Sequence, residues 1–341
     1  MRQKPRSISR SARSDFPTPL GPSNSTPSPS RATQLAWICP AKRIVWHFGA
    51  FRGPREATCR CNMRLAIFFA SEPPARRRKM TSPVLLETDP RGIATVTLNR
   101  PERGNAYDEA LLEALIAGLE RLAADLTIRA LVIRGAGKHF QAGADIDWLA
   151  RAATYPPERA FSASMATTRA MQLLNEFPHP TLALVHGACF GGGCGVVCCV
   201  DVALATPAAV FGLTEVRVGV APSPISTHMV HAMGLRHTRR YALTGERFDA
   251  AEACRIGLVH EVVAADALEA RLGEILDALL LGAPGAISAT KRSFLGANGL
   301  TLDARQMALL AHESWMQRNS AEGTEGTAAF KARRKPAWYP K

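Results

Sequence analysis

The stretch FGGGCGVVCCVD, residues 190–201, places three consecutive glycines before a small, apolar, cysteine-rich run. It follows TLALVHG, residues 181–187, which is apolar enough to predict a buried strand. A phosphate-binding loop needs a Lys after the glycines, and a dinucleotide loop needs a glycine where this sequence has valine, so neither fits. A strand that turns through glycines directly into a helix presents unpaired backbone N–H groups that a ligand can approach closely. Such a turn suits an anion that forms during a reaction, as in an oxyanion hole.

An oxyanion hole needs a second donor, and the loop FQAGADI, residues 140–146, is the candidate. It follows the apolar segment ALVIRG, residues 130–135, contains a glycine and opens a predicted helix, for which Asp145 and Asp147 supply N-cap carboxylates. Either loop alone would indicate an ordinary strand-to-helix turn. The two together, with a carboxylate motif downstream, favour a catalytic site.

The hydrophobic pattern alternates between strands and helices in the middle of the chain. Strands are predicted at 83–88, 92–98, 130–135 and 181–187, and helices at about 111–126 and 157–176. This alternation predicts an α/β fold with a parallel sheet. From Pro224 the pattern is helical apart from the short strand LVHEVV, with helices at about 225–242, 249–255, 264–281, 284–297, 302–318 and 321–333. We therefore expect an α/β core at 80–280 and a helical region at 281–341.

The net charge of +13 lies entirely in the first 79 residues. Residues 1–79 hold 16 of the 42 Lys and Arg and 3 of the 29 acidic residues, whereas the rest of the chain holds 26 of each. This segment is rich in Arg, Ser and Pro, lacks a hydrophobic period and is expected to be disordered. It is interpreted as a translated region upstream of a start at Met80, with an organelle transit peptide or a nucleic-acid-binding arm as alternatives. For the remainder, which carries no net charge, no nucleic-acid partner is expected.

The cysteines and the apolar runs argue against two further classes of protein. No CxxC pair is followed by a second pair or by histidines, so no metal site is expected. The cysteines after residue 80 lie in apolar surroundings, which predicts small buried side chains in a reducing cytoplasm. No apolar run is long enough for a membrane span. The protein is accordingly expected to be cytoplasmic.

Six motifs, in order along residues 83–338, resemble the enoyl-CoA hydratase/isomerase family, also called the crotonase family. They are LNRPERGNA, FQAGADI, GACFGGGCG, CVDVALATPAAVFGLTEVRVGVAP, YALTGERFDAAEACRIGLVHEVV and AAFKARRKPAW. The resemblance implies a spiral of ββα units with a C-terminal helical region, assembled as a homotrimer or a dimer of trimers. It also implies a coenzyme A thioester as substrate and no separate cofactor.

The resemblance also assigns roles to particular residues. The N–H groups of Ala144 and Gly192 would hold the thioester oxygen. Contacts with the substrate or its coenzyme A are implied for Gly191, Gly195, Phe330 and Arg333, and through the backbone around Arg103, Asn105 and Ala106 and around Ala142, Gly143, Asp145 and Ile146. Phe330 and Arg333 match the positions that meet the adenine and the 3′-phosphate, often from a neighbouring subunit.

The hydratases of this family carry two glutamates, of which this sequence keeps one. Gly195 stands at the first position, and Glu215 stands at the second, twenty residues later. Hydration with one carboxylate requires Glu215 to take a proton from water and return it to C2, which a syn addition allows. Isomerisation needs only one base that carries a proton between two carbons. The number of carboxylates therefore favours an isomerase.

Finer likeness favours a hydratase. GCGVVCCVD, FGLTEVRVGVAP and SPIS resemble the branch that hydrates methylglutaconyl-CoA or isohexenylglutaconyl-CoA in leucine or acyclic terpene degradation. We expect an enoyl-CoA hydratase of this kind, with a Δ3,Δ2-enoyl-CoA isomerase or a non-catalytic acyl-CoA-binding homologue as alternatives. The extra carboxylate of a glutaconyl chain would need a cation or donors, for which Arg217, His186 and His228 are candidates. Trp148 and Met229 are expected in the core in preference to the acyl cavity.

Overall fold

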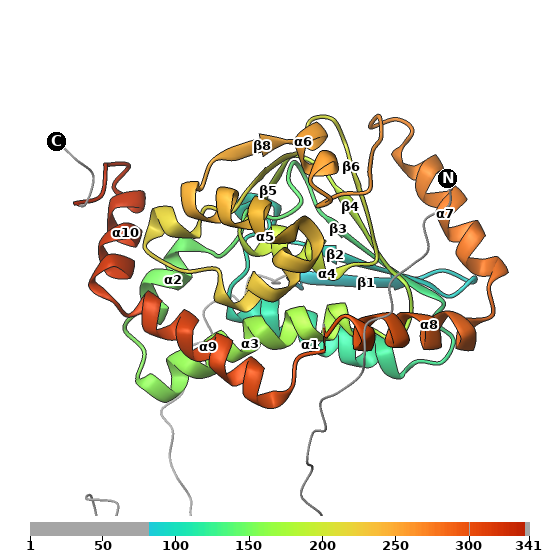
Figure 1. The fold of residues 1–341 in the computed structure, drawn as a ribbon, viewed down its shortest axis with the longest axis horizontal. Helices are drawn as coiled ribbons and strands as arrows, with labels where there is room; N and C mark the ends of the chain where they lie inside the picture. The colour runs from blue at the N-terminus through green and yellow to red at the C-terminus, as the bar shows by residue number, and fades with distance from the viewer. Residues whose placement is uncertain (1–81, 300, 338–341) are drawn as a thin grey trace, which may run out of the picture. The chain divides into compact units, whose positions relative to one another are not determined.

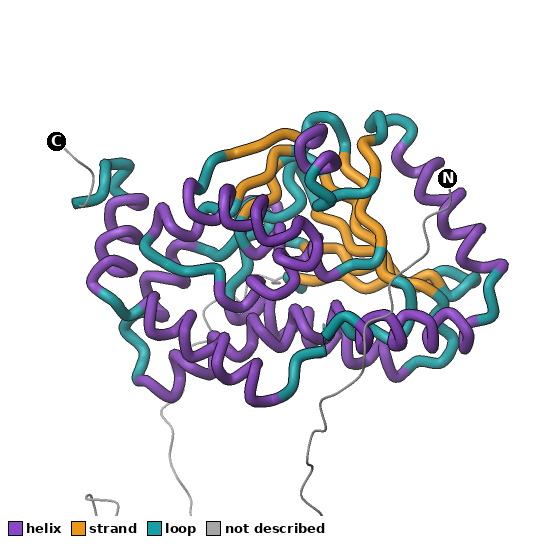
Figure 2. Tube along the Cα trace, in the orientation of Figure 1, coloured by secondary structure: helices purple, strands orange, loops and turns teal. Residues whose placement is uncertain are grey.

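A computed structural model describes residues 82–299 and 301–337 of the chain. Within these residues, two β-sheets are packed against helices, as Figures 1 and 2 show. The fold is mixed α/β with a helical C-terminal region, as predicted. The expectations for residues 1–79 lie outside the described residues, and the expected boundary between residues 280 and 281 stays a prediction.

The larger sheet has six strands in the order β1-β2-β3-β4-β6-β9. These strands are β1 (Val84–Thr88), β2 (Ile93–Leu98), β3 (Ala130–Gly135), β4 (Thr181–Val185), β6 (Val202–Ala205) and β9 (Glu261–Val262). β1 is antiparallel to β2, and each later pair of neighbours is parallel. The predicted parallel sheet is therefore confirmed, with the β1–β2 hairpin at one edge.

The middle strands of this sheet are buried on both faces. On β3, Leu131 and Ile133 join the core that includes α1 (Glu109–Ala124) and α3 (Pro157–Asn175), whereas Ala130 and Val132 pack with residues of α7 (Leu268–Leu281). Helices on both faces leave no solvent side for a polar residue to occupy. This explains why the sequence of β3 is an unbroken apolar run and does not alternate.

A second, smaller sheet positions the site. Its strands are β5 (Ala188–Phe190), β7 (Val210–Gly212) and β8 (Arg247–Asp249), in the order β5-β7-β8. β5 and β7 are parallel, and β8 is antiparallel to β7. Strands of three residues are too short to show a period of two, so the hydrophobic pattern did not predict them.

The C-terminal helices were predicted correctly in number and approximate position. The helices not yet introduced are α2 (Ile146–Ala152), α4 (Gly192–Cys199), α5 (Ser226–Thr244), α6 (Ala250–Arg255), α8 (Pro284–Ala297), α9 (Ala304–Arg318) and α10 (Ala321–Lys331), with 3₁₀ turns η1 (Pro101–Arg103), η2 (Glu215–Val218) and η3 (Ser223–Ile225). α5 is interrupted at Gly234, whose φ of 72° and ψ of 154° are not helical. α9 lies along α3, and α10 packs against α2 and η2 (Figure 1).

No single helix among residues 82–299 and 301–337 has the length and apolar character to cross a membrane. Only α7 and α8 taken together meet that criterion, and they are bent by 101° where they join.

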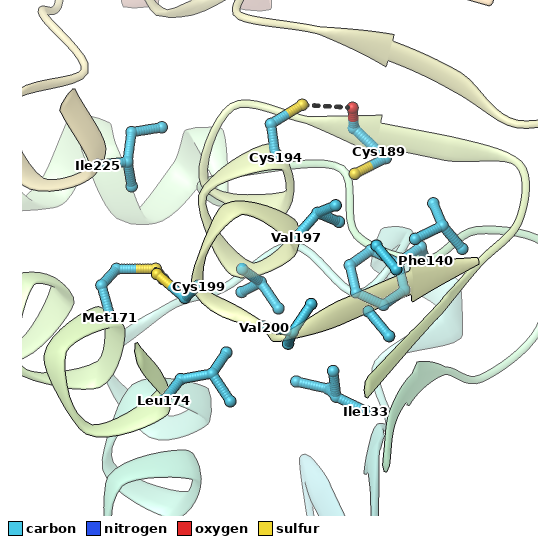
Figure 3. Packing of buried hydrophobic residues seen from close by; sticks show 14 of the residues in the cluster. Ile133, Phe140, Met171, Leu174, Cys189, Cys194, Val197, Cys199, Val200 and Ile225 are labelled. Atoms are coloured by element: carbon cyan, nitrogen blue, oxygen red, sulfur yellow. Dashed lines mark hydrogen bonds between the residues drawn. The ribbon is translucent and has the colours of Figure 1, made fainter. Parts of the chain in front are cut away.

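The cysteines of the described chain are unpaired and contribute to packing. Cys189, Cys194 and Cys199 are buried in the core beside Met171 and Phe140 (Figure 3). The Cys194 thiol lies 3.2 Å from the carbonyl oxygen of Cys189 and donates to it. Burial raises the pKa of the Cys199 thiol far above its usual range, so that it stays protonated. The prediction of small buried side chains is confirmed for these three.

One close contact joins the C-terminal helix to the segment after β7. A Cβ atom added to Gly326 of α10 would overlap the backbone carbonyl of Val218 and lie 2.8 Å from the nitrogen of Gly219. The obstacle is backbone, which cannot rotate away as a side chain can. The α10 helix therefore reaches η2 only because residue 326 has no side chain.

We expect Gly326→Ala to lower the free energy of unfolding by about 1–3 kcal/mol, because α10 must move away from η2. Gly273→Ala in α7 is the matched control, since nothing lies within 4 Å of its added Cβ and alanine favours a helix by about 1 kcal/mol. Urea unfolding of both variants measures the difference. Equal stability of the two would contradict the described packing.

Candidate active site

The glycine loop turns β5 into α4 with its backbone exposed. Gly191 has a φ of 52° and a ψ of −117°, a conformation that residues with a Cβ rarely adopt. Its N–H donates to the carbonyl of Gly212 at 2.8 Å, whereas the N–H of Gly192 donates to no group in the described chain. A Cβ atom added to Gly192 would lie only 2.5 Å from Cε1 of Tyr107. Glycine is therefore required at both positions, and one helix-terminal N–H remains available.

The second loop lies directly against the first. The carbonyl of Gln141 accepts from the N–H of Phe190 at 2.9 Å, and the N–H of Gln141 donates to Ala188 at 3.1 Å. A Cβ atom added to Gly143, which has a φ of 89°, would lie 3.1 Å from the carbonyl oxygen of Phe190. The N–H of Ala144 donates to no group among the residues the structure describes. The predicted pair of loops therefore meets, and each contributes one unused N–H.

Asp145 fixes the start of α2. Its carboxylate accepts from the N–H groups of Asp147 at 2.9 Å and Trp148 at 3.1 Å, and it forms an ion pair with Arg103 at 3.0 Å. Burial alone would raise the pKa of this carboxyl, but the hydrogen bonds from Arg103 and Trp148 hold it below its usual value. The N-cap prediction is confirmed for Asp145.

Asp147 has a different role from the one predicted. It caps no helix and forms ion pairs with Arg103 at 2.6 Å and Lys331 at 2.8 Å. Hydrogen bonds from Lys331 and Arg103 lower its pKa to about 2. Lys331 belongs to α10, so this acid ties the C-terminal helix to α2.

Glu215 is the acidic residue of the site. β7 leads into η2, which begins at this residue. A Cβ atom added to Gly191 would lie 2.9 Å from Oε1 of Glu215, so the carboxyl group faces the glycine loop. Its Oε2 atom is buried and has no hydrogen-bond partner among the described residues. Burial raises the pKa of Glu215 to about 7, against a smaller opposing effect of its own backbone N–H.

A cavity of about 480 Å³ joins these groups. It is lined by eight of the residues predicted for the site: Ala142, Gly143, Ala144, Ile146, Gly191, Gly192, Glu215 and Phe330. Apolar side chains such as Leu149, Val218 and Ile225 form much of the remaining wall. A carboxyl group that can both accept and donate a proton near neutral pH thus shares one enclosure with two unused N–H groups.

The other predicted residues do not line the cavity. Arg103 and Asp145 pair with each other, Ala106 is buried, and Arg333 lies exposed after α10 with a φ of 52°. Asn105 is fully buried and donates to the carbonyls of Ala136 at 2.9 Å and His139 at 2.7 Å. The side chain of Asn105 therefore supports the loop from within and is unavailable to a ligand.

The three residues predicted to bind a carboxylate on the acyl group lie in different places in the structure. Arg217 lines the cavity, whereas His186 and His228 do not. His186 lies 2.9 Å from the carbonyl of Gly137 through its Nε2 atom. His228 is buried with neither ring nitrogen bonded in the described chain, and burial lowers its pKa to about 4. Trp148 and Met229 belong to the core, as predicted.

Six polar lining residues were missed at the level of sequence: Tyr107, Thr167, Thr214, Arg247, Ser314 and Arg318. They come from the segment before α1, from α3, from the turn before η2, from β8 and from α9. The only available signal was the spacing of Ser314 and Arg318, which puts both on one face of a helix. That spacing is common in solvated helices and indicates no site by itself.

Gly195 lies one turn into α4 and meets Ile225 from η3. A Cβ atom added to Gly195 would overlap Cγ2 of Ile225 and lie 3.0 Å from its Cβ. Ile225 lines the cavity and Gly195 does not. The place that a side chain at position 195 would occupy is therefore filled by Ile225.

The fold and the site together define an α/β protein that presents two backbone N–H groups and one buried carboxyl group to a single cavity. This arrangement suits enzymes that polarise a carbonyl group and move a proton beside it. The family model for enoyl-CoA hydratase/isomerase matches residues 88–341. The chain belongs to this family, and its fold is the crotonase fold of its structural neighbours.

Individual relatives support this assignment. The 2,3-dehydroadipyl-CoA hydratase of Escherichia coli is 30% identical over 252 residues, which cover 72% of this chain and 94% of that protein. The hydroxycinnamoyl-CoA hydratase-lyase of Pseudomonas fluorescens is 34% identical over 64% of this chain and 81% of its own length. The structure of Pseudomonas aeruginosa AtuE matches with a TM-score of 0.61 and 41% identity, over 75% of this chain and 99% of AtuE. An enoyl-CoA hydratase from Mycobacterium avium matches with a TM-score of 0.67 and 32% identity, over 76% and 100%.

We expect Gly195→Ala to lower the free energy of unfolding by about 1–3 kcal/mol, because Ile225 has to shift. Ile225→Ala removes the obstructing methyl group, so the double variant should be more stable than the sum of the two single effects allows. Urea unfolding of the four proteins gives this coupling. Strict additivity would show that the two residues do not compete for space.

Glu215→Gln should stabilise the protein more at pH 8 than at pH 5. The wild-type carboxyl has a pKa of about 7 when folded, above the ordinary value of 4.5, so folding opposes its ionisation. Stability is therefore lost as the pH rises from about 4.5 to about 7, and the neutral amide avoids this loss. Thermal unfolding of both proteins at the two pH values measures it. A difference in midpoint that is the same at pH 5 and pH 8 would contradict the raised pKa.

Proposed function

We propose that this protein is an enoyl-CoA hydratase that adds water across C2=C3 of an enoyl-CoA thioester. The thioester oxygen lies between the N–H groups of Ala144 and Gly192, which stabilise the negative charge that develops on it. The observation that carries the proposal is the carboxyl group of Glu215, which faces the glycine loop and whose buried Oε2 atom has no hydrogen-bond partner among the described residues.

Glu215 serves as both base and acid. Its carboxylate takes a proton from water as the oxygen of that water bonds to C3, and the electrons of the double bond move to form the enolate. The protonated Glu215 then returns its proton to C2, which restores the thioester carbonyl. Both transfers occur on one face of the substrate, so the addition is syn. A pKa of about 7 suits this exchange, because neither form of the carboxyl is strongly disfavoured at neutral pH.

We further infer that the acyl group is of the branched glutaconyl type, as in methylglutaconyl-CoA or isohexenylglutaconyl-CoA, with a role in leucine or terpene degradation. Support comes from the likeness of the segments around Gly195 and Glu215 to that branch. A relative named for 2,3-dehydroadipyl-CoA, a thioester that bears a second carboxyl group, also supports it.

Coenzyme A binding is proposed for the loop at 142–146 and for Phe330 and Arg333. Phe330 lines the cavity of its own chain and is 57% exposed, so it can contact a group that extends to the surface. We propose a cytoplasmic homotrimer or dimer of trimers that needs no separate cofactor. Exposed apolar side chains on the last helices, such as Phe294 at 70% and Leu309 at 59% exposure, support such an assembly.

A Δ3,Δ2-enoyl-CoA isomerase is the second candidate, favoured by the single carboxyl group at the cavity. It would carry a proton between C2 and C4 through Glu215 without adding water. Product analysis separates the two activities, since hydration removes the conjugated enoyl absorbance and gives a 3-hydroxyacyl thioester, whereas migration gives an isomer of unchanged mass.

We expect Glu215→Gln to lower kcat by about a thousandfold or more, because Glu215 carries the only carboxyl group that lines the cavity among the described residues. In the wild type, kcat/KM should fall as the pH drops below about 7, because the free enzyme then loses the carboxylate that serves as base. The matched control is Glu269→Gln on α7, an exposed acid that pairs with Arg134 and should change the rate less than twofold. Turnover by Glu215→Gln at the wild-type rate would show that another group serves as the base, whereas the absence of turnover in the wild type would favour a non-catalytic acyl-CoA binder.

A further inference from the structure

Arg318 is a buried cation at the end of α9 without an acidic partner in the described chain. Only 6% of its surface is exposed, and it lines the same cavity as Glu215. Its guanidinium donates to the hydroxyl of Ser164 and lies 5.4 Å from the ring centroid of Trp148. Among the described residues, no Asp or Glu forms an ion pair with it.

A buried guanidinium without an acidic partner is costly, because one hydroxyl acceptor does not replace all the water that a solvated guanidinium binds. Other arginines near the site avoid this cost. Arg103 pairs with two aspartates, and Arg217 and Arg247 of the cavity lining are exposed to solvent. Arg318 therefore has the property expected of a group whose partner arrives with a ligand.

The neighbours of Arg318 are also hydrogen-bonding groups. Thr167 on α3 and Ser314, one turn earlier on α9, are buried and line the cavity with it. Burial raises the pKa of Tyr107 to about 12, and the charges of Glu215 and Arg318 are both close enough to act on its ionisation. Because Tyr107 also touches Gly192, this polar group lies just beyond the reacting part of the cavity.

The difference in exposure among the lining residues distinguishes the mouth of the cavity from its deep end. Arg217, Arg247 and Phe330 are exposed and mark its mouth, whereas Thr167, Ser314 and Arg318 are buried and mark its deep end. Coenzyme A is too large for a space of about 480 Å³ and has to leave through the mouth. A thioester whose carbonyl lies at the two loops then directs its acyl chain towards Arg318.

We propose that Arg318, with the hydroxyls of Thr167 and Ser314, binds a carboxylate at the far end of the acyl chain and so selects dicarboxylic monothioesters. This proposal rests on the proposed function for the orientation of the substrate. Arg318 replaces the three residues predicted from the sequence to bind this carboxylate. His186 and His228 do not line the cavity, and Arg217 lies at its mouth.

The test compares two thioesters that differ only at the chain end. 3-Methylglutaconyl-CoA carries the carboxylate, and 3-methylpent-2-enoyl-CoA has a methyl group in its place. We expect the wild type to prefer the acid by at least about a hundredfold in kcat/KM. Arg318→Gln should lose this preference by lowering the rate with the acid, while the neutral thioester changes by less than about threefold. Arg318→Lys, which keeps the charge without the fork, should fall between and gives the same readout if the Gln variant does not fold.

Two matched control variants distinguish recognition of the carboxylate by Arg318 from a structural role of this residue. Ser164→Ala removes the bond between Arg318 and α3 but keeps the cation, so the preference for the acid should persist. Arg217→Gln removes the exposed cation at the mouth and should affect both thioesters by the same factor. The proposal is overturned if Arg318→Gln or Arg318→Lys changes both thioesters equally, or if Arg217→Gln abolishes the preference.

Equilibrium binding keeps this test independent of catalysis. The saturated compounds 3-methylglutaryl-CoA and 3-methylpentanoyl-CoA cannot be hydrated, and titration calorimetry measures their affinities directly. Tighter binding of the acid that disappears in Arg318→Gln supports the carboxylate site even if no hydration is found. Equal affinities of the wild type for the two compounds would overturn it even if hydration is fast.

Discussion

The site depends on one buried carboxyl group, that of Glu215, whose Oε2 atom has no hydrogen-bond partner among the described residues. Glu215 faces a loop of glycines, so backbone approaches it where side chains could otherwise donate to its Oε2 atom. Burial moves its pKa to about 7, whereas a neighbouring arginine would have moved it down, as Arg103 helps to do for Asp145. The absence of a partner among the described residues is thus what allows this acid to exchange protons near neutral pH. The core around it has to offset the cost.

That core is arranged so that backbone meets backbone at the site. The two loops are joined by hydrogen bonds of Gln141 with Ala188 and Phe190, and α10 approaches η2 at a point where neither Gly326 nor Gly219 has a side chain. Each contact removes water without adding a polar side chain. The result is an enclosure in which N–H groups and one carboxyl group act at low dielectric, where their effect on a developing charge is strongest.

Glycine stands at position 195, where the resemblance implies the first glutamate of the family's hydratases, and this glycine has a local physical explanation. Ile225 occupies the space that a side chain on Gly195 would need, and its own side chain faces the cavity. The large side chain at position 225 therefore leaves no room for a side chain at position 195. The cavity wall beside position 195 is therefore apolar, and Glu215 carries the only carboxyl group that lines the cavity among the described residues.

The sequence by itself determined the class of fold and the two loops of the site. The unbroken apolar strands, the long amphipathic helices and the glycine turn are local patterns. They can be recognised from neighbouring residues without knowing which distant residues they contact. Glu215, Ala144 and Gly192 could be chosen because their motifs are local too. Only the tertiary structure decided that Asp147 binds Lys331, that Ile225 fills the place beside Gly195, and that Arg318 enters the cavity from α9. The paired residues lie 184 positions apart for Asp147 and Lys331, 30 apart for Gly195 and Ile225, and 103 apart for Glu215 and Arg318. Such contacts are not encoded in the periodicity of a single segment.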